Sequence, residues 1–110
     1  MQLTATAHAA DNIHDPTIAA VNAASLSLLK ADIGWKGPIG CVRMGLLEVE
    51  KGKGDVFVVN PTVEQLQHSK LDLVYAGTAE RPLMMECVAN EVPEAQMRQA
   101  MQVRFNYDKL

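Results

Sequence analysis

The side chains best suited to metal binding or nucleophilic catalysis are scattered along this sequence. The histidines are His8, His14 and His68, and the cysteines are Cys41 and Cys87. Neither set has the short, repeated spacing of a metal site, and no histidine lies close in sequence to a cysteine that it would activate. We therefore expect surface histidines, buried inert thiols and no metal ion.

One carboxylate stands out because it interrupts an apolar run. Asp72 lies between Leu71 and Leu73, with Val74 after them. A carboxylate in such a strand either faces a backbone donor or belongs to a functional site. The residue types alone leave both alternatives open.

Glycines and lysines gather in two turns. Gly34, Gly37, Gly40 and Gly45 have neither nucleotide-binding spacing nor a following Gly-Lys-Ser/Thr, so they indicate turns and close packing. The run 51–54, Lys-Gly-Lys-Gly, predicts a hairpin whose lysines are solvated charges, at a tip that is open to RNA contact.

Composition limits the class of protein. The chain has 110 residues, 48% of them apolar, with ten Lys and Arg against thirteen Asp and Glu. This predicts one domain over 1–110, neither disordered nor membrane-spanning. The charge of −3 disfavours a free-standing nucleic-acid binder. Two distant cysteines and an N-terminus without a signal-peptide pattern favour a reducing compartment and exclude secretion.

Hydrophobic spacing predicts the elements that position these residues. Residues 2–10 alternate as a strand does, and Asp15-Pro16 is a helix start with Asp15 as the N-cap. We expect Gly34 and Gly37-Pro38 to end that helix. The predicted elements are strand 2–10, helix 17–31, strands 41–50 and 55–60, short helix 61–68, strands 71–76 and 83–89, and a helix from 93.

The element order β-α-β-β-(α)-β-β-α predicts an α+β fold, a mixed sheet with helices on one face. Met84 and Met85 are expected to fill the core. The buried face of the last helix is predicted to comprise Met97, Ala100, Met101 and Phe105.

Four motifs carry a family resemblance. They are 15–25 (DPTIAAVNAAS), 37–45 (GPIG and VRMG), 60–62 (NPT) and 69–78 (SKLDLVYAGT). In this order and spacing they resemble the later part of the first ribonuclease-PH-like core domain of polynucleotide phosphorylase. That family degrades RNA from the 3′ end with phosphate, releases nucleoside diphosphates, and forms three-chain rings.

The resemblance implies that this is an inactive copy of the core. The active copy of the family holds phosphate on a Gly-Ser-rich turn, where this chain has residues 14–17, His-Asp-Pro-Thr. It also holds a metal with two aspartates six residues apart, followed by a lysine, where this chain has Leu66, Asp72 and Val74. We therefore expect no catalytic, phosphate-binding or metal-binding residue, and fold-holding roles for Asp15 and Asp72. The chain itself would need no cofactor, while the complete family enzyme uses magnesium and phosphate.

The same resemblance predicts the partners. The arginine-rich RNA grip of the family would lie before Met1, so we expect a partial domain with open sheet edges. Such a chain would be oligomeric or poorly soluble. We expect other protein chains to complete its core fold or its ring, and RNA to bind to it weakly or only through those partner chains. The candidates for RNA proximity are Lys36, Gly37, Arg43, Lys51 and Lys53.

The residues and the resemblance together are compatible with two functions. The first is a non-catalytic scaffold segment of a 3′–5′ phosphorolytic exoribonuclease, a nucleotidyltransferase. The alternative is a repurposed structural subunit of a larger RNA–protein assembly, such as an organellar ribosome or an RNA-processing complex. An independent enzyme is the least favoured. The matching compartments are a mitochondrial or other organellar matrix, or the bacterial cytoplasm.

Overall fold

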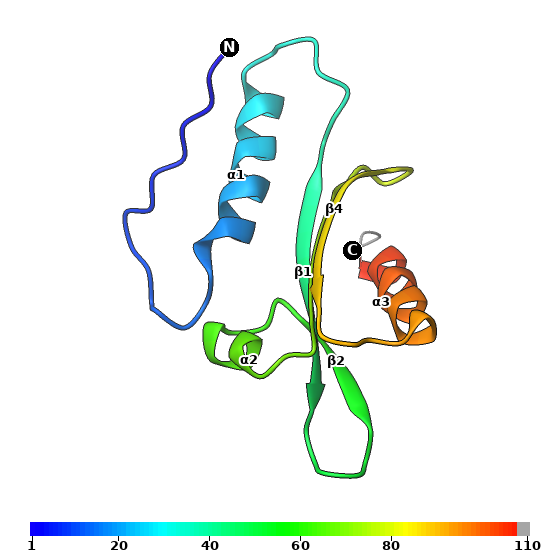
Figure 1. Cartoon of the computed structure of the whole chain (residues 1–110). Helices are drawn as coiled ribbons and strands as arrows, with labels where there is room; N and C mark the ends of the chain where they lie inside the picture. Colours follow the sequence, from blue (N-terminus) through cyan, green and yellow to red (C-terminus); the bar gives the residue numbers. More distant parts are fainter. Residues whose placement is uncertain (108–110) are drawn as a thin grey trace.

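The computed structural model of the chain describes residues 1–107, and the side chains of residues 1–102. Its elements, in chain order, are α1 (Pro16–Lys30), β1 (Gly40–Glu48), β2 (Asp55–Val59), α2 (Val63–Gln67), β3 (Leu71–Gly77), β4 (Pro82–Ala89) and α3 (Glu94–Tyr107). The four strands form one sheet in the order β2-β1-β3-β4 (Figure 1). The α+β class is confirmed, and the seven elements lie within about two residues of every bound predicted for them, the last helix having a predicted start only.

All strand pairs in the described sheet are antiparallel, so the expectation of a mixed sheet is wrong. The physical reason is the connections. The β1–β2 and β3–β4 links are short hairpins, which reverse the chain, and the link from β2 to β3 carries only the five-residue α2. In the first hairpin Gly52 and Gly54 take φ values of 84° and 89°, as the Lys-Gly-Lys-Gly pattern predicts.

Helices cover both faces of the sheet, which corrects the prediction of helices on one face (Figure 1). On one face, Ile18 and Val21 of α1 pack against Cys41 and Ala76. On the other, Ala100 of α3 joins the larger core, whose fully buried strand residues are Met44, Leu46, Leu71 and Leu73. The two sets alternate along β1 and β3 because successive strand side chains point to opposite faces. Met97 packs on the same core and Met101 is half-buried, while the side chain of Phe105 lies outside the described part.

The helix start at Asp15 and the helix end near residue 31 are confirmed, but the glycines predicted to stop the helix do not do so. Asp15 caps α1, and Pro16 occupies the first turn. The helix ends at Lys30 with Ala31 as C-cap, and the chain then turns at Asp32, whose φ is 49°. Gly34 and Gly37 therefore belong to the following loop and do not stop the helix.

Residues 2–10 do not form a strand, which corrects the prediction from their alternation. They run as an extended segment of exposed residues beside α1 (Figure 1). A strand exists only when a neighbouring strand supplies its hydrogen bonds. Among residues 1–107 no strand lies beside this segment.

The strand β4 is exposed along its whole length, and this corrects the expectation that Met84 and Met85 fill the core. Each of these two methionines is 47% exposed, and Val88 is 71% exposed. β4 pairs with β3 as predicted but is the last strand of the sheet, and the buried core that includes Ala100 of α3 contains none of its residues. The helix contacts β4 through Met97, whose Sδ lies 4.0 Å from the Cys87 Sγ. Within residues 1–107, no helix has the length and apolar character needed to cross a membrane.

Candidate functional site

An arginine held between two carboxylates connects the sheet to α1. Arg43 of β1 donates from Nε and Nη2 to the two carboxylate oxygens of Asp72 on β3, each at 2.7 Å. Its Nη1 donates to Oδ2 of Asp15 at 2.5 Å. The Arg43 side chain is 18% exposed, while Asp15 and Asp72 are 30% and 31% exposed. The arrangement is a half-buried ion network that uses both ends of the guanidinium.

Strand alternation and register place these groups together. Asp72 is the register partner of Gly45, and Arg43 lies two residues before Gly45 on the same face of β1. A Cβ at Gly45 would lie 3.1 Å from the Ser69 Oγ and 3.3 Å from the Pro61 Cγ, so only glycine leaves those neighbours undisturbed. The Arg43 guanidinium therefore extends from β1 to the neighbouring strand β3, where it binds Asp72.

Asp15 joins the network to the first turn of α1. Its Oδ1 accepts from the Thr17 backbone N–H at 2.9 Å and from the Thr17 hydroxyl at 2.6 Å, while Oδ2 faces Arg43. The hydrogen bonds from Thr17, followed by the one from Arg43, lower the pKa of Asp15 below its usual value. The hydrogen bond to Asp72, then that to Asp15, raises the pKa of the Arg43 guanidinium. Both shifts favour the charged forms of Asp15 and Arg43, which strengthens the ion pair between them.

The five candidates for RNA proximity are not brought together. Lys36 and Gly37 lie in the loop between α1 and β1, and Lys51 and Lys53 lie in the β1–β2 hairpin at the opposite end of β1 (Figure 1). Lys53 also pairs with Glu50 at 2.5 Å. Arg43 lies between these ends with its guanidinium directed to Asp15 and Asp72. The proximity of these residues to RNA stays a prediction.

Two of the three positions that correspond to the metal-binding aspartates and lysine of the resembling family are apolar here, and the third is Asp72. Leu66 is half-buried in α2, and Val74 packs against the α1 face of the sheet next to Asp72. At the start of α1, the Asp15 carboxylate occupies the Thr17 donors that would otherwise face an incoming anion. This local chemistry favours holding α1 to the sheet over binding phosphate or metal.

Thiols and histidines add no catalytic group to this cluster. Cys41 is buried, and its burial raises the pKa of the thiol. Cys87 is exposed, a correction to the expectation of two buried thiols, and partial desolvation followed by the charge of Asp72 raises its pKa. His14 pairs with Asp11 at 2.8 Å in the loop before α1. Among the described residues, no group of three or more His, Cys, Asp or Glu is arranged to hold a metal ion.

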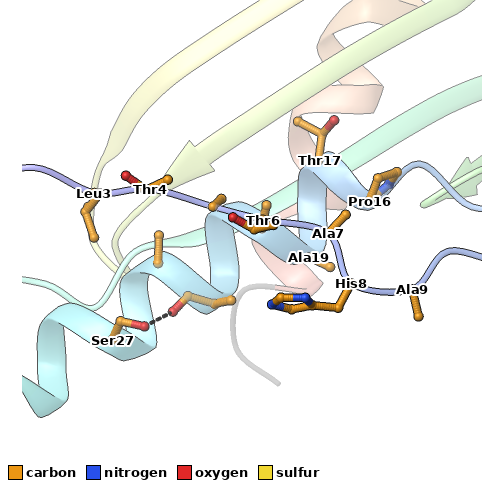
Figure 2. Close-up of a pocket in the computed structure, with 14 residues that line it drawn as sticks. Leu3, Thr4, Thr6, Ala7, His8, Ala9, Pro16, Thr17, Ala19 and Ser27 are labelled. Atoms are coloured by element: carbon orange, nitrogen blue, oxygen red, sulfur yellow. Dashed lines mark hydrogen bonds between the residues drawn. The ribbon is translucent and has the colours of Figure 1, made fainter.

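A hollow lies between α1 and the extended N-terminal segment. It has a volume of about 830 Å³ and is lined on one side by residues 3–9 and on the other by small side chains of α1 (Figure 2). The α1 wall includes Ala19, Ala20, Ala23 and Ser27, and the Ser27 hydroxyl donates back to the Ala23 carbonyl. His8 is the one titratable side chain in the described lining. This hollow therefore has a wall suited to packing and no set of residues suited to catalysis.

Sequence reasoning missed three polar side chains that fix β1. Asn22 of α1 accepts from the Cys41 N–H at 2.8 Å and donates to the Cys41 carbonyl at 3.1 Å. Ser25 accepts from the Ile39 N–H at 2.9 Å. Asn60 accepts from the Arg43 N–H through its side chain, and its own N–H donates to the Arg43 carbonyl. Polar residues on the sheet-facing side of a predicted helix would have been the signal for the first two.

Comparison with known proteins gives consistent matches. Residues 37–106 match the family described as "3' exoribonuclease family, domain 2". The polyribonucleotide nucleotidyltransferase of Thermus thermophilus is 43% identical over 102 residues, which cover 93% of this chain and 14% of that protein. The proteins of the same name from Synechococcus sp. (strain RCC307) and Halothermothrix orenii are 41% and 43% identical, over 98% and 94% of this chain. The chain spans about 14% of the length of these relatives.

Proposed function

The chain belongs to the 3′ exoribonuclease family, and from that premise we propose that it is a non-catalytic core-domain segment of a 3′–5′ phosphorolytic exoribonuclease. Its role would be to support the fold of an RNA-degrading assembly. Magnesium and phosphate would act at other parts of the complete enzyme. The named relatives come from bacteria, which favours the bacterial over the organellar compartment.

The observation that carries this proposal is the closed ion network of Arg43. The three donors of its guanidinium that face the protein are taken by Asp15 and Asp72, and the Thr17 donors are taken by Asp15. A phosphoryl-transfer site needs donors that stay free for phosphate and a carboxylate set that stays free for metal. In this chain, those groups are used to join α1 to the sheet.

A segment exchange tests the proposal directly. In the Thermus thermophilus relative, the 102 matching residues would be replaced by this chain, and phosphate-dependent release of nucleoside diphosphates from RNA would be measured. We expect the chimera to keep the activity of its parent within about threefold, and the isolated chain to release nothing. A folded but inactive chimera, or release by the isolated chain, would contradict the scaffold role.

The lysines of the hairpin provide a second readout in the same chimera. Substitution of Lys51 and Lys53 by alanine should raise KM for RNA without lowering kcat if the hairpin lies along the RNA path. The matched control is Lys30→Ala, at the exposed C-terminal end of α1. Equal KM values for RNA in the two variants would show that the hairpin does not contact RNA, and this result would not contradict the scaffold role.

A further inference from the structure

The family match and the packing divide this chain at the same place. The match begins at residue 37, inside the loop 31–39 that joins α1 to β1, so α1 lies outside it. The larger core takes its residues from the matched part alone. Its buried members are Met44, Leu46, Leu71, Leu73 and Ala100, and Phe57, Val59, Val92 and Met97 pack against them. The sheet and α3 therefore have a core of their own, to which α1 contributes nothing.

The interface between α1 and the sheet is of a different kind. Its buried apolar part is small, with Ile18 of α1 against Cys41 and Ala76. Its other contacts are polar, since Asn22 binds the Cys41 backbone and Ser25 accepts from the Ile39 N–H. Water can replace polar partners at a low net cost, whereas the exposure of a large apolar core is expensive. Such an interface opens more readily than the core does.

Arg43 closes this interface with unequal bonds. Asp72, inside the matched part, takes two donors of the guanidinium, whereas Asp15 takes one across the interface. If α1 moves away, Asp72 still neutralises and orients Arg43, and Asp15 moves together with its Thr17 donors. Separation therefore leaves no buried charge without a partner, which is the main cost of breaking a buried ion pair. The guanidinium stays in place to receive Asp15 again.

The loop 31–39 is suited to act as a hinge. It begins at Ala31, the C-cap of α1, and Asp32 follows with a positive φ of 49°. A Cβ added at Gly34 would meet no atom within 4 Å, so the backbone there has room to move. Beyond it the Trp35 ring lies against Gly37, with three ring atoms 2.5–2.6 Å from the place of an added Cβ. The loop can therefore bend near Gly34 without disturbing the larger core.

We propose that α1 is a separate docking element of this fold. It leaves and rejoins the sheet while residues 40–107 stay folded, with the loop 31–39 as the hinge and the Asp15–Arg43 pair as the closing contact. The contacts of this interface lie within residues 15–76, so flanking segments of a longer protein would add to them without replacing them. This motion is independent of the proposed role in RNA degradation, and each proposal can fail without the other.

Hydrogen exchange of the 110-residue chain, followed residue by residue by NMR, tests the opening. A helix of 15 residues is marginal in water by itself, so α1 loses its protection when it leaves the sheet. We expect the amides of residues 20–30 to be at least about tenfold less protected than those of Leu73 and Tyr75 in β3, which is paired on both sides. Equal protection of α1 and β3 would indicate one cooperative unit and overturn the proposal.

Asp15→Asn tests the closing contact. The asparagine keeps a capping side chain but removes the charge that faces Arg43. We expect the protection of α1 to fall about fivefold further, while that of β3 changes by less than about twofold. The matched control is Asp11→Asn, because the Asp11 carboxylate binds the N–H groups of Ile13 and His14 before the helix. An equal fall in α1 and β3, or the same fall in both variants, would overturn the proposal.

Cleavage of the hinge tests whether residues 40–107 stay folded without α1. A recognition sequence for a site-specific protease would be inserted after Gly34 in the full chain, and the uncleaved protein is the control. After cleavage we expect the sheet signal in circular dichroism to persist when the two fragments separate on dilution. In Asp15→Asn, the fragments should separate at an about fivefold higher concentration. Loss of the sheet signal on separation, or equal separation in both proteins, would contradict a separately docking α1.

Discussion

Arg43 and Asp72 form two parallel hydrogen bonds, both of 2.7 Å, across β1 and β3. They are 29 residues apart in the chain and meet because Asp72 pairs in register with Gly45. Asp15 binds the remaining side of the guanidinium, so the same arginine connects two strands and the start of α1.

Asp72→Asn should destabilise the fold. The amide accepts with one oxygen only, which leaves part of the half-buried guanidinium without its charged partner. We expect a loss of about 1–3 kcal/mol in the free energy of unfolding, measured by urea titration. Glu86→Gln, an exposed carboxylate on the adjacent strand, is the control and should change stability by less than about 0.5 kcal/mol. Equal effects would show that Arg43–Asp72 contributes nothing beyond surface charge.

Asp15 should make stability depend on pH. Its pKa in the folded chain is lower than the ordinary value of 3.8, so the folded state binds fewer protons than the unfolded state in the acid range. The contribution is therefore complete above pH 3.8 and falls as the pH drops below that value toward the folded pKa. Asp15→Asn keeps a capping side chain but removes the charge. The stability difference between the two proteins should be larger at about pH 7 than at about pH 3, and a constant difference would exclude the ionised carboxylate as the cause.

Asn22→Ala should loosen α1 from the sheet. Both its hydrogen bonds go to the backbone of Cys41, and their loss leaves an N–H and a carbonyl of β1 unsatisfied. We expect a cost of about 1–3 kcal/mol. Ser27→Ala on the same helix is the matched control, because the Ser27 hydroxyl bonds only within α1 to Ala23. Urea titration of both variants, followed by circular dichroism, separates the two outcomes.

Asp55 should control how firmly α3 is held. Asp55, the first residue of β2, accepts from Lys70, just before β3, at 2.9 Å and from Gln96 of α3 at 3.3 Å. In Asp55→Ala, backbone amides of α3 should exchange with deuterium faster, while those of α1 should be unchanged. Gln96→Ala should reproduce the effect on α3, whereas Glu94→Ala, which starts the same helix, should not. Uniform acceleration across both helices would indicate global destabilisation instead.

The local pattern was sufficient for most of the fold. Asp15-Pro16 predicts a capped helix start, and Lys-Gly-Lys-Gly predicts the hairpin, because both depend on backbone geometry within a few residues. The strands 71–76 and 83–89 follow from apolar runs separated by a turn. The same rules failed for residues 2–10, since alternation identifies residues able to form a strand but does not provide the partner strand.

What the sequence by itself determined is therefore the type of every helix and strand that forms, though not the absence of a strand at residues 2–10, and, through its motifs, the family. The tertiary structure alone decided that helices cover both faces, that Met84 and Met85 of β4 are exposed, and that Asp72 faces Arg43. The periodicity of a strand separates its two faces but does not reveal what lies opposite either of them. That depends on register and on packing between residues distant in the chain, which local physical rules do not encode.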